Sequence, residues 1–144
     1  MKHGEKLAML VTLDKGAYLP ERAHEQDAGY DLRTPEAFKL AGLSGKTIDT
    51  GVHVMIPSGY VGFLKSKSGL NVKHSITGEG VIDAGYTGSI KVKLYNHSEA
   101  DYTFAAGDKI IQLVLLPVFT PDLKQVDKLD DTERGENGFG STGR

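Results

Sequence analysis

The sequence predicts an all-β fold, a sandwich or jelly roll built from many short strands. Short runs of β-branched and other apolar residues recur along the chain, and glycine, proline or aspartate bounds each run. Turn signals return roughly every ten residues, which is typical of such folds. Helical periodicity is hard to find, so we expect no long helix. The 144 residues suffice for one domain with its own core.

The first strands are expected early and in the middle of the chain. Residues 7–13 form one apolar run. Residues 47–66 contain two more strands, divided by a turn at residues 57–59 with the sequence PSG. A short helical turn follows at residues 68–73, with Ser68 as its cap.

Two later strands differ in their pattern. In residues 89–96 the apolar side chains Ile90, Val92 and Leu94 alternate with polar ones, which predicts a half-buried strand. Residues 109–119 are apolar on both faces except at Gln112, which predicts a central strand.

The C-terminal part reads differently from the rest. Residues 127–133 are acidic and poorly patterned, and we interpret them as a tether. Residues 134–144 contain four glycines around one bare aromatic, Phe139, so a flexible arm is expected. The predicted division is therefore a β domain over residues 1–126 and a tether with its arm over residues 127–144.

Composition narrows the class of protein. The chain has no cysteine, which excludes a disulfide framework and a thiolate zinc site. Its net charge of −2 offers no basic field for nucleic acid. The first apolar run is short and Asp14 interrupts it, so neither a signal peptide nor a membrane span is expected. We expect a cytoplasmic protein, of a bacterium or a phage-infected cell, with no stable nucleic-acid partner and no membrane partner.

Several polar stretches break the local pattern and each has two interpretations. Asp31 lies in a strand-like segment, where it either faces water, the interpretation favoured by its surroundings alone, or serves a cation. The turn KSKSGL is either plainly solvated or an anion cradle, in which backbone N–H groups and the Ser68 hydroxyl meet a phosphate. Gln112 belongs to a structural network or contacts a ligand. The five histidines lie far apart and are expected at surface or boundary positions.

The stretch GEGVIDAGYTGSI predicts a hairpin whose tip carries Asp83 and Tyr86. Asp83 is either a turn-former or a general base. Main chain left unpaired at an open tip would read the edge of a flat heterocycle. Asp31 could serve a metal ion, and Phe139 could stack on a flat base. An anion-binding set could hold phosphates, and its members are Ser68, Arg134, Ser141 and Thr142. Together with the hairpin tip, these groups suit a nucleotide with its phosphates.

Five stretches, AGYDL, KSGL, GVIDAGYTGSI, GDKIIQL and RGENGFGSTG, resemble in sequence and order the five motifs of the trimeric dUTP diphosphatase family. The resemblance spans residues 28–143. It implies a β jelly roll that forms a three-fold homotrimer and hydrolyses dUTP to dUMP and diphosphate with Mg²⁺ as cofactor. Such an enzyme keeps uracil out of DNA and supplies dUMP for thymidylate synthesis.

The resemblance also implies a role for each matching residue. Asp83 would orient and deprotonate the attacking water, Tyr86 would pack under the deoxyribose, and Asp31 would hold a water on the metal. Main chain around Gly80 and Ile82 would bind the uracil base, and Ser68, Gly69 and Gln112 would bind phosphate. An arm from a neighbouring subunit would close over the site, with the contacts Arg134, Phe139, Gly140, Ser141 and Thr142.

One departure and two rivals stay open. Lys67 stands where the family usually has arginine, so a point charge replaces a bidentate fork and its role is less certain. One rival is the related dCTP deaminase. The other is a regulator on the same fold that binds a protein in response to nucleotide.

Overall fold

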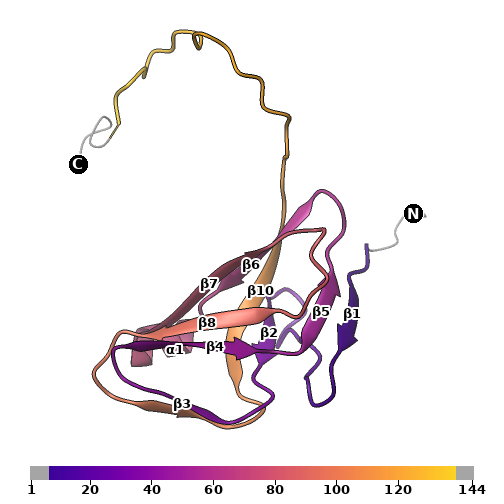
Figure 1. Ribbon diagram of the computed structural model, residues 1–144, viewed down its shortest axis with the longest axis vertical. Helices are drawn as coiled ribbons and strands as arrows, with labels where there is room; N and C mark the ends of the chain where they lie inside the picture. Colours follow the sequence, from indigo (N-terminus) through magenta and orange to yellow (C-terminus); the bar gives the residue numbers. More distant parts are fainter. Residues whose placement is uncertain (1–6, 139–144) are drawn as a thin grey trace.

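The computed structural model describes residues 7–138 and consists mainly of short strands (Figure 1). The strands are β1 (Leu10–Leu13), β2 (Gly29–Arg33), β3 (Phe38–Leu40), β4 (Ser44–Asp49), β5 (Val52–Met55), β6 (Tyr60–Lys65), β7 (Ile76–Ile82), β8 (Lys91–Asn96), β9 (Tyr102–Phe104) and β10 (Lys109–Pro117), and the helix is α1 (Ser68–His74). The predicted all-β class is confirmed. Over the described part of the chain, no helix has the length and apolarity that a bilayer crossing requires.

The strands form one large curled sheet and two small ones. The large sheet has the order β2-β10-β6-β7-β8-β4, while β1 pairs with β5 and β3 with β9. Every ladder is antiparallel. The inward side chains of these sheets make one continuous apolar core, which is the packing expected of a jelly roll.

Both strand patterns predicted from the sequence are confirmed. On β8, Val92 and Leu94 are buried while Lys91 and Lys93 are exposed. β10 lies between β2 and β6 in the large sheet, as a central strand should. A register shift near its start lets Ile110 and the residue after it both be buried.

The predicted turn between β5 and β6 is also present. The Tyr60 amide donates to the Pro57 carbonyl at 3.2 Å. Gly59 has φ of +87°, which only glycine adopts readily and which a type II turn requires at this place.

The predicted cap of the short helix is wrong by one residue. Lys67 is the N-cap, with extended backbone at φ −73° and ψ 126°, and no side chain caps the helix. Ser68 is already the first helical residue, so its hydroxyl is not used as a cap. An N-cap residue has extended backbone, which Lys67 has and the helical Ser68 does not, and the Lys67 side chain contacts Asp31 and not the helix.

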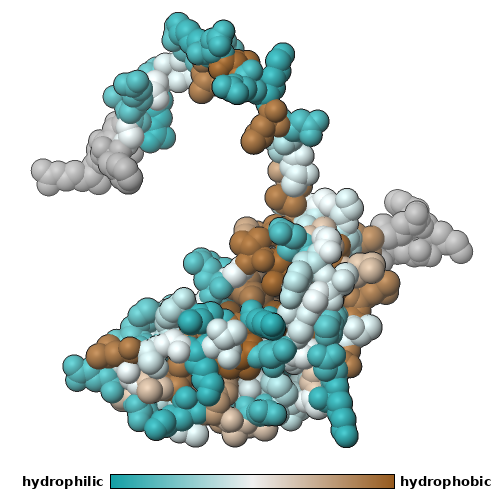
Figure 2. Space-filling view, viewed as in Figure 1, coloured by the Kyte–Doolittle hydropathy of each residue, from teal (hydrophilic) through white to brown (hydrophobic). Residues whose placement is uncertain are grey.

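The chain leaves the body of the protein after β10. Within residues 7–138, its last backbone bond to the body joins the Val118 amide to the Gly59 carbonyl at 2.9 Å. Residues 119–138, here called the extension, then run away from the sheets in a long arc (Figure 1). Hydrophobic residues recur along the extension and gather where it leaves the body (Figure 2). Phe119 is 86% exposed and Leu123 is 96% exposed, so the chain's own core does not cover these side chains.

Candidate functional site

A first polar cluster lies where β2, β10 and the start of α1 meet. Asp31 on β2 is only 5% exposed and is the register partner of Gln112 on β10. The ammonium group of Lys67 contacts one Asp31 oxygen, and Lys109 Nζ lies 3.3 Å from the other. The solvent-facing interpretation of Asp31 is therefore wrong, because two cations hold its carboxylate inside the protein.

Gln112 has a structural partner in this cluster. Its Nε2 donates to the Ser66 carbonyl at 3.0 Å, which joins β10 to the turn before α1. A Cβ placed on Gly29 would lie 2.1 Å from Gln112 Oε1, so glycine is required beside the amide. Gln112 also lines a hollow of about 260 Å³ together with Asp31, Lys67 and Lys109. The structural-network interpretation is confirmed, and the amide still borders open space.

The turn before α1 is fixed to β7 and leaves its tip open. Ser66 Oγ donates to the Gly78 carbonyl at 3.1 Å and accepts from the Gly78 amide at 3.0 Å. Ser68 and Gly69 follow and are both exposed. A Cβ on Gly69 would meet nothing within 4 Å, so the backbone here is accessible to a ligand.

A second cluster lies at the far end of β7. The ladder between β7 and β8 runs only from Ile76 to Gly78, whereas the ladder between β7 and β6 continues to Ile82. The two strands of the predicted hairpin therefore separate, and the hairpin is open at its tip. Around Gly80 and Ile82, β7 has β6 as its only ladder neighbour among the strands described.

The loop at residues 83–90 carries both tip residues in an ordered turn. The Tyr86 amide donates to the Asp83 carbonyl at 3.0 Å, and the Tyr86 hydroxyl donates to the Ser89 carbonyl at 2.7 Å. A Cβ on Gly88 would lie 2.6 Å from the Tyr86 hydroxyl, so this position must stay bare. Asp83 and Tyr86 are both exposed to solvent. The tip thus presents a carboxylate and a fixed aromatic ring.

Two side chains that the sequence analysis did not assign to the site anchor this loop. Ser89 Oγ donates to the Asp49 carboxylate, and this bond, followed by one from the Gly51 amide, lowers the pKa of Asp49. His53 Nδ1 lies 2.8 Å from the Thr87 carbonyl oxygen. No local motif reveals these contacts, because they join residues 34 and 40 positions apart.

A single chain does not bring the two clusters together. In the β6–β7 ladder Ile82 pairs with Gly62, while Lys65, at the other end, pairs with Glu79. These two ends are about 10 Å apart at the rise of a β-strand. Asp83 continues the ladder beyond one end, and Ser68 lies beyond the other.

The predicted arm residues lie apart from both clusters or outside the described residues. Arg134 is exposed on the extension, and its Nε donates to the Asn137 carbonyl at 2.7 Å. Phe139, Gly140, Ser141 and Thr142 lie outside the described residues.

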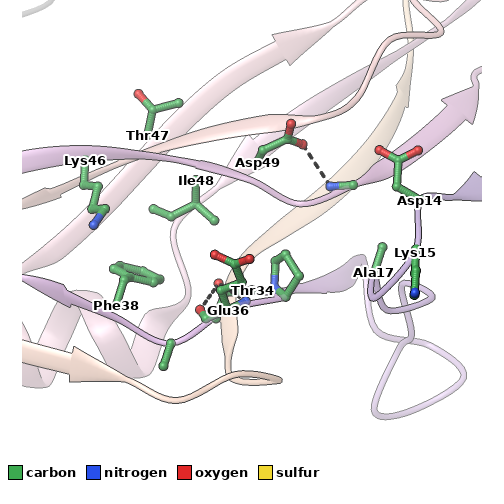
Figure 3. A pocket seen from close by; sticks show the side chains of 13 residues that line it. Asp14, Lys15, Ala17, Thr34, Glu36, Phe38, Lys46, Thr47, Ile48 and Asp49 are labelled. Atoms are coloured by element: carbon green, nitrogen blue, oxygen red, sulfur yellow. Dashed lines mark hydrogen bonds between the residues drawn. The ribbon is translucent and has the colours of Figure 1, made fainter.

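A hollow of about 400 Å³ lies elsewhere. Mixed charges from Asp14, Lys15, Glu36, Lys46 and Asp49 line it, between the β1–β2 connection, β3 and β4 (Figure 3). Its lining contains none of the predicted site residues. We therefore place the candidate site at the two clusters, which carry the chemistry, and not at this hollow.

The fold and the clusters define a class of protein: a jelly roll with an open hairpin tip, a cationic turn and a C-terminal extension that leaves the body. A family model described as dUTPase matches residues 15–143. The deoxyuridine 5'-triphosphate nucleotidohydrolase of Candida albicans is 45% identical over 143 residues, which cover 97% of this chain and 89% of the relative. The chain belongs to the dUTPase family.

Solved structures agree with this assignment. The dUTPase of Staphylococcus bacteriophage 80alpha, solved with dUPNHPP, matches with a TM-score of 0.89 and 36% identity, over 96% of this chain and 100% of that chain. A mutant dUTPase from phage phi11 of S. aureus matches with a TM-score of 0.79 and 34% identity, over 85% of this chain and 98% of that chain. Its structure is described as showing how a structural Mg(II) ion is coordinated. The predicted jelly-roll fold is confirmed.

Proposed function

We propose that the protein is a dUTP diphosphatase, which hydrolyses dUTP to dUMP and diphosphate. The observation that carries this proposal is the open tip of the β7–β8 hairpin, where Asp83 is exposed beside the fixed ring of Tyr86. A carboxylate at this place aligns a water for attack on the α-phosphorus and accepts its proton. General-base assistance of this kind contributes a rate factor of about 10²–10⁴.

Tyr86 selects the deoxy sugar in this proposal. Its hydroxyl is bonded to the Ser89 carbonyl, so the ring has a fixed position and offers its face to a ligand. A sugar packed on that face has no room for a 2′-hydroxyl.

The base is read by main chain of the open hairpin around Gly80 and Ile82, where β7 is not paired with β8. Hydrogen-bonding groups arranged for uracil would have no partners on cytosine, so the site would discriminate strongly against cytosine nucleotides. Phe139 of the arm covers the base by stacking.

The triphosphate is assigned to the first cluster and the arm. We propose that Ser68, Gly69 and Gln112 contact phosphate oxygens, and that Arg134, Gly140, Ser141 and Thr142 hold the distal end of the substrate. Lys67 and Lys109 together set two ammonium groups against the single Asp31 carboxylate, so this cluster keeps one excess positive charge, although Lys67 cannot make the bidentate contact of the usual arginine.

Mg²⁺ fits this site only through substrate and water. In residues 7–138 no cluster of three or more histidine, aspartate or glutamate side chains offers a ready-made cage. The Asp31 carboxylate is shared by two ammonium groups, so it is not free for direct ligation in the first cluster. Mg²⁺ commonly keeps several waters and binds phosphate oxygens, and Asp31 is suited to hold one of those waters. When bound, the ion neutralises the triphosphate and fixes its shape.

A three-fold homotrimer would complete the site. The hairpin tip and the cationic turn lie at opposite ends of one ladder, and the apolar side chains of the extension are left uncovered by their own body. Both features are explained if each site combines surfaces of different subunits, with residues 1–126 as the domain and residues 127–144 as an arm that reaches a neighbour. We further propose that the enzyme acts in the cytoplasm.

The test is incubation with a panel of NTPs and dNTPs plus Mg²⁺, measuring diphosphate, ammonia and bound nucleotide. The proposal predicts diphosphate from dUTP and little from dCTP, dTTP or UTP. Ammonia from dCTP would support the deaminase instead. Tight dUTP binding without turnover would support the nucleotide-responsive regulator.

A further inference from the structure

The ring of His53 lies between two groups that can only accept hydrogen bonds. Nδ1 is 2.8 Å from the Thr87 carbonyl oxygen, and Nε2 is 3.1 Å from Asp14 Oδ1. A neutral imidazole has one N–H and can donate to only one of them. An imidazolium ion donates from both ring nitrogens, so protonated His53 can make both bonds at once.

The surroundings favour that ion. The Thr87 carbonyl bond, and then the Asp14 bond, raise the pKa of His53 above its ordinary 6.5, and the charges of Asp14 and Asp49 act in the same direction. Asp14 comes from the β1–β2 connection and Asp49 ends β4. The His53 side chain is 28% exposed, so protons reach it freely.

The same loop has a second anchor that does not titrate in this range. Ser89 Oγ donates to Asp49, whose pKa is lowered and whose carboxylate therefore stays ionised at neutral pH. Asp49 also receives the Gly51 amide at 3.0 Å, drawn as a dashed line in Figure 3. Between pH 6 and 8.5 the bond through Asp49 is constant, and only the bond through His53 changes.

We propose that His53 is a positioning residue that, as an imidazolium ion, clamps the 83–90 loop to β5 and the β1–β2 connection and so fixes the ring of Tyr86. Thr87 directly follows Tyr86, and the Tyr86 hydroxyl is bonded within the same loop. The pKa of His53 in the folded protein is raised above its ordinary value of 6.5. The clamp is therefore fully formed below pH 6.5 and is lost as the pH rises through the pKa of the folded state. Its consequence for sugar selection rests on the proposed function, whereas the clamp itself does not.

The clamp is tested by NMR on the full chain without nucleotide. Ring ¹⁵N shifts should show both His53 nitrogens protonated at pH 6, a His53 pKa above 6.5, and a lower His53 pKa in Asp14→Asn.

Hydrogen exchange of the loop is the second measurement. After correction for the pH dependence of intrinsic amide exchange, amides of residues 85–90 should exchange about two- to fivefold faster at pH 8.5 than at pH 6, as suits a partly exposed ion pair. His53→Gln should abolish that pH dependence, and the exposed control His24→Gln should retain it. A His53 pKa at or below 6.5, or loop exchange independent of pH in the wild type, would overturn the clamp.

A kinetic measurement tests the positioning role. The wild-type ratio of kcat/KM for dUTP over UTP should fall about two- to fivefold from pH 6 to 8.5, and the ratio for His53→Gln should not change with pH. The ratio removes pH effects that are common to both substrates, such as titration of the phosphates. A wild-type ratio that is constant with pH would overturn the positioning role. If neither nucleotide is hydrolysed, the proposed function fails, and the NMR result still decides the clamp.

Discussion

Asp83 is the exposed carboxylate at the start of the 83–90 loop. Asp83→Asn preserves the size of the side chain and removes its ability to accept a proton. We predict that dUTP binding is retained while single-turnover hydrolysis slows by at least roughly 10²-fold. Glu99→Gln, an exposed change in the β8–β9 connection, is the matched control and should hydrolyse at the wild-type rate. Near-wild-type turnover by the Asp83 variant would remove this residue from the mechanism.

A second prediction for a single residue concerns the stability that Asn96 contributes. Its side chain is buried, donates to the carbonyls of Leu40 at 3.1 Å and Ala100 at 2.8 Å, and accepts from the Ser98 amide. Asn96→Ala leaves buried polar groups without partners, so the free energy of unfolding should fall by about 2 kcal/mol or more. Lys93→Ala, at an exposed position of the same strand, should change it by less than about 0.5 kcal/mol. Denaturant unfolding at one fixed protein concentration measures both, and equal losses would contradict the burial argument.

At the scale of structural elements, the 83–90 loop requires a residue without a side chain at Gly88. A Cβ on Gly88 would collide with the Tyr86 hydroxyl, whereas a Cβ on Gly85 would meet nothing within 4 Å. Gly88→Ala should therefore displace the Tyr86 ring and narrow the preference for dUTP over UTP, as Tyr86→Ala should. Gly85→Ala is the control and should keep the preference. The ratio of kcat/KM values measures it, and an unchanged ratio in Gly88→Ala would mean that sugar exclusion lies elsewhere.

Elements with a regular local pattern were predictable from sequence. The alternation of β8 and the two apolar faces of β10 follow from periodicity, and both strands are confirmed. Contacts between distant residues were not predictable in this way. The burial of Asp31 depends on Lys67 and Lys109, which only the fold brings to it. The N-cap of α1 is Lys67 and not the predicted Ser68, and the Lys67 side chain contacts Asp31, which is distant in sequence.

The site was predictable only in part for a related reason. Its candidate chemical groups follow from the resemblance of the motifs, because each motif is local, and their roles stay predictions. The anchors Asp49 and His53 lie on the β4–β5 part of the chain and reach the loop across 40 and 34 residues. No spacing rule connects them to Tyr86.

At the scale of the whole molecule, the separation of the clusters and the uncovered extension make a prediction about assembly. One inactive chain carries Asp83→Ala with an intact arm, and another keeps Asp83 but lacks residues 134–144. In a cyclic head-to-tail trimer, any mixed ring has one junction where an intact hairpin meets a neighbour's intact arm. Random mixing should restore about a quarter of all sites. Background activity in a preparation shown by native mass measurement to contain mixed trimers would contradict an arm that reaches a neighbour.

Attack of a water molecule on the α-phosphorus of dUTP is tested most directly by hydrolysis with the protein and Mg²⁺ in water enriched in oxygen-18. Mass measurement then locates the solvent oxygen in the products. If a water at Asp83 attacks the α-phosphorus, dUMP carries one heavy oxygen and the diphosphate carries none. Intact dUTP, or a heavy oxygen in the diphosphate instead of dUMP, would contradict the account.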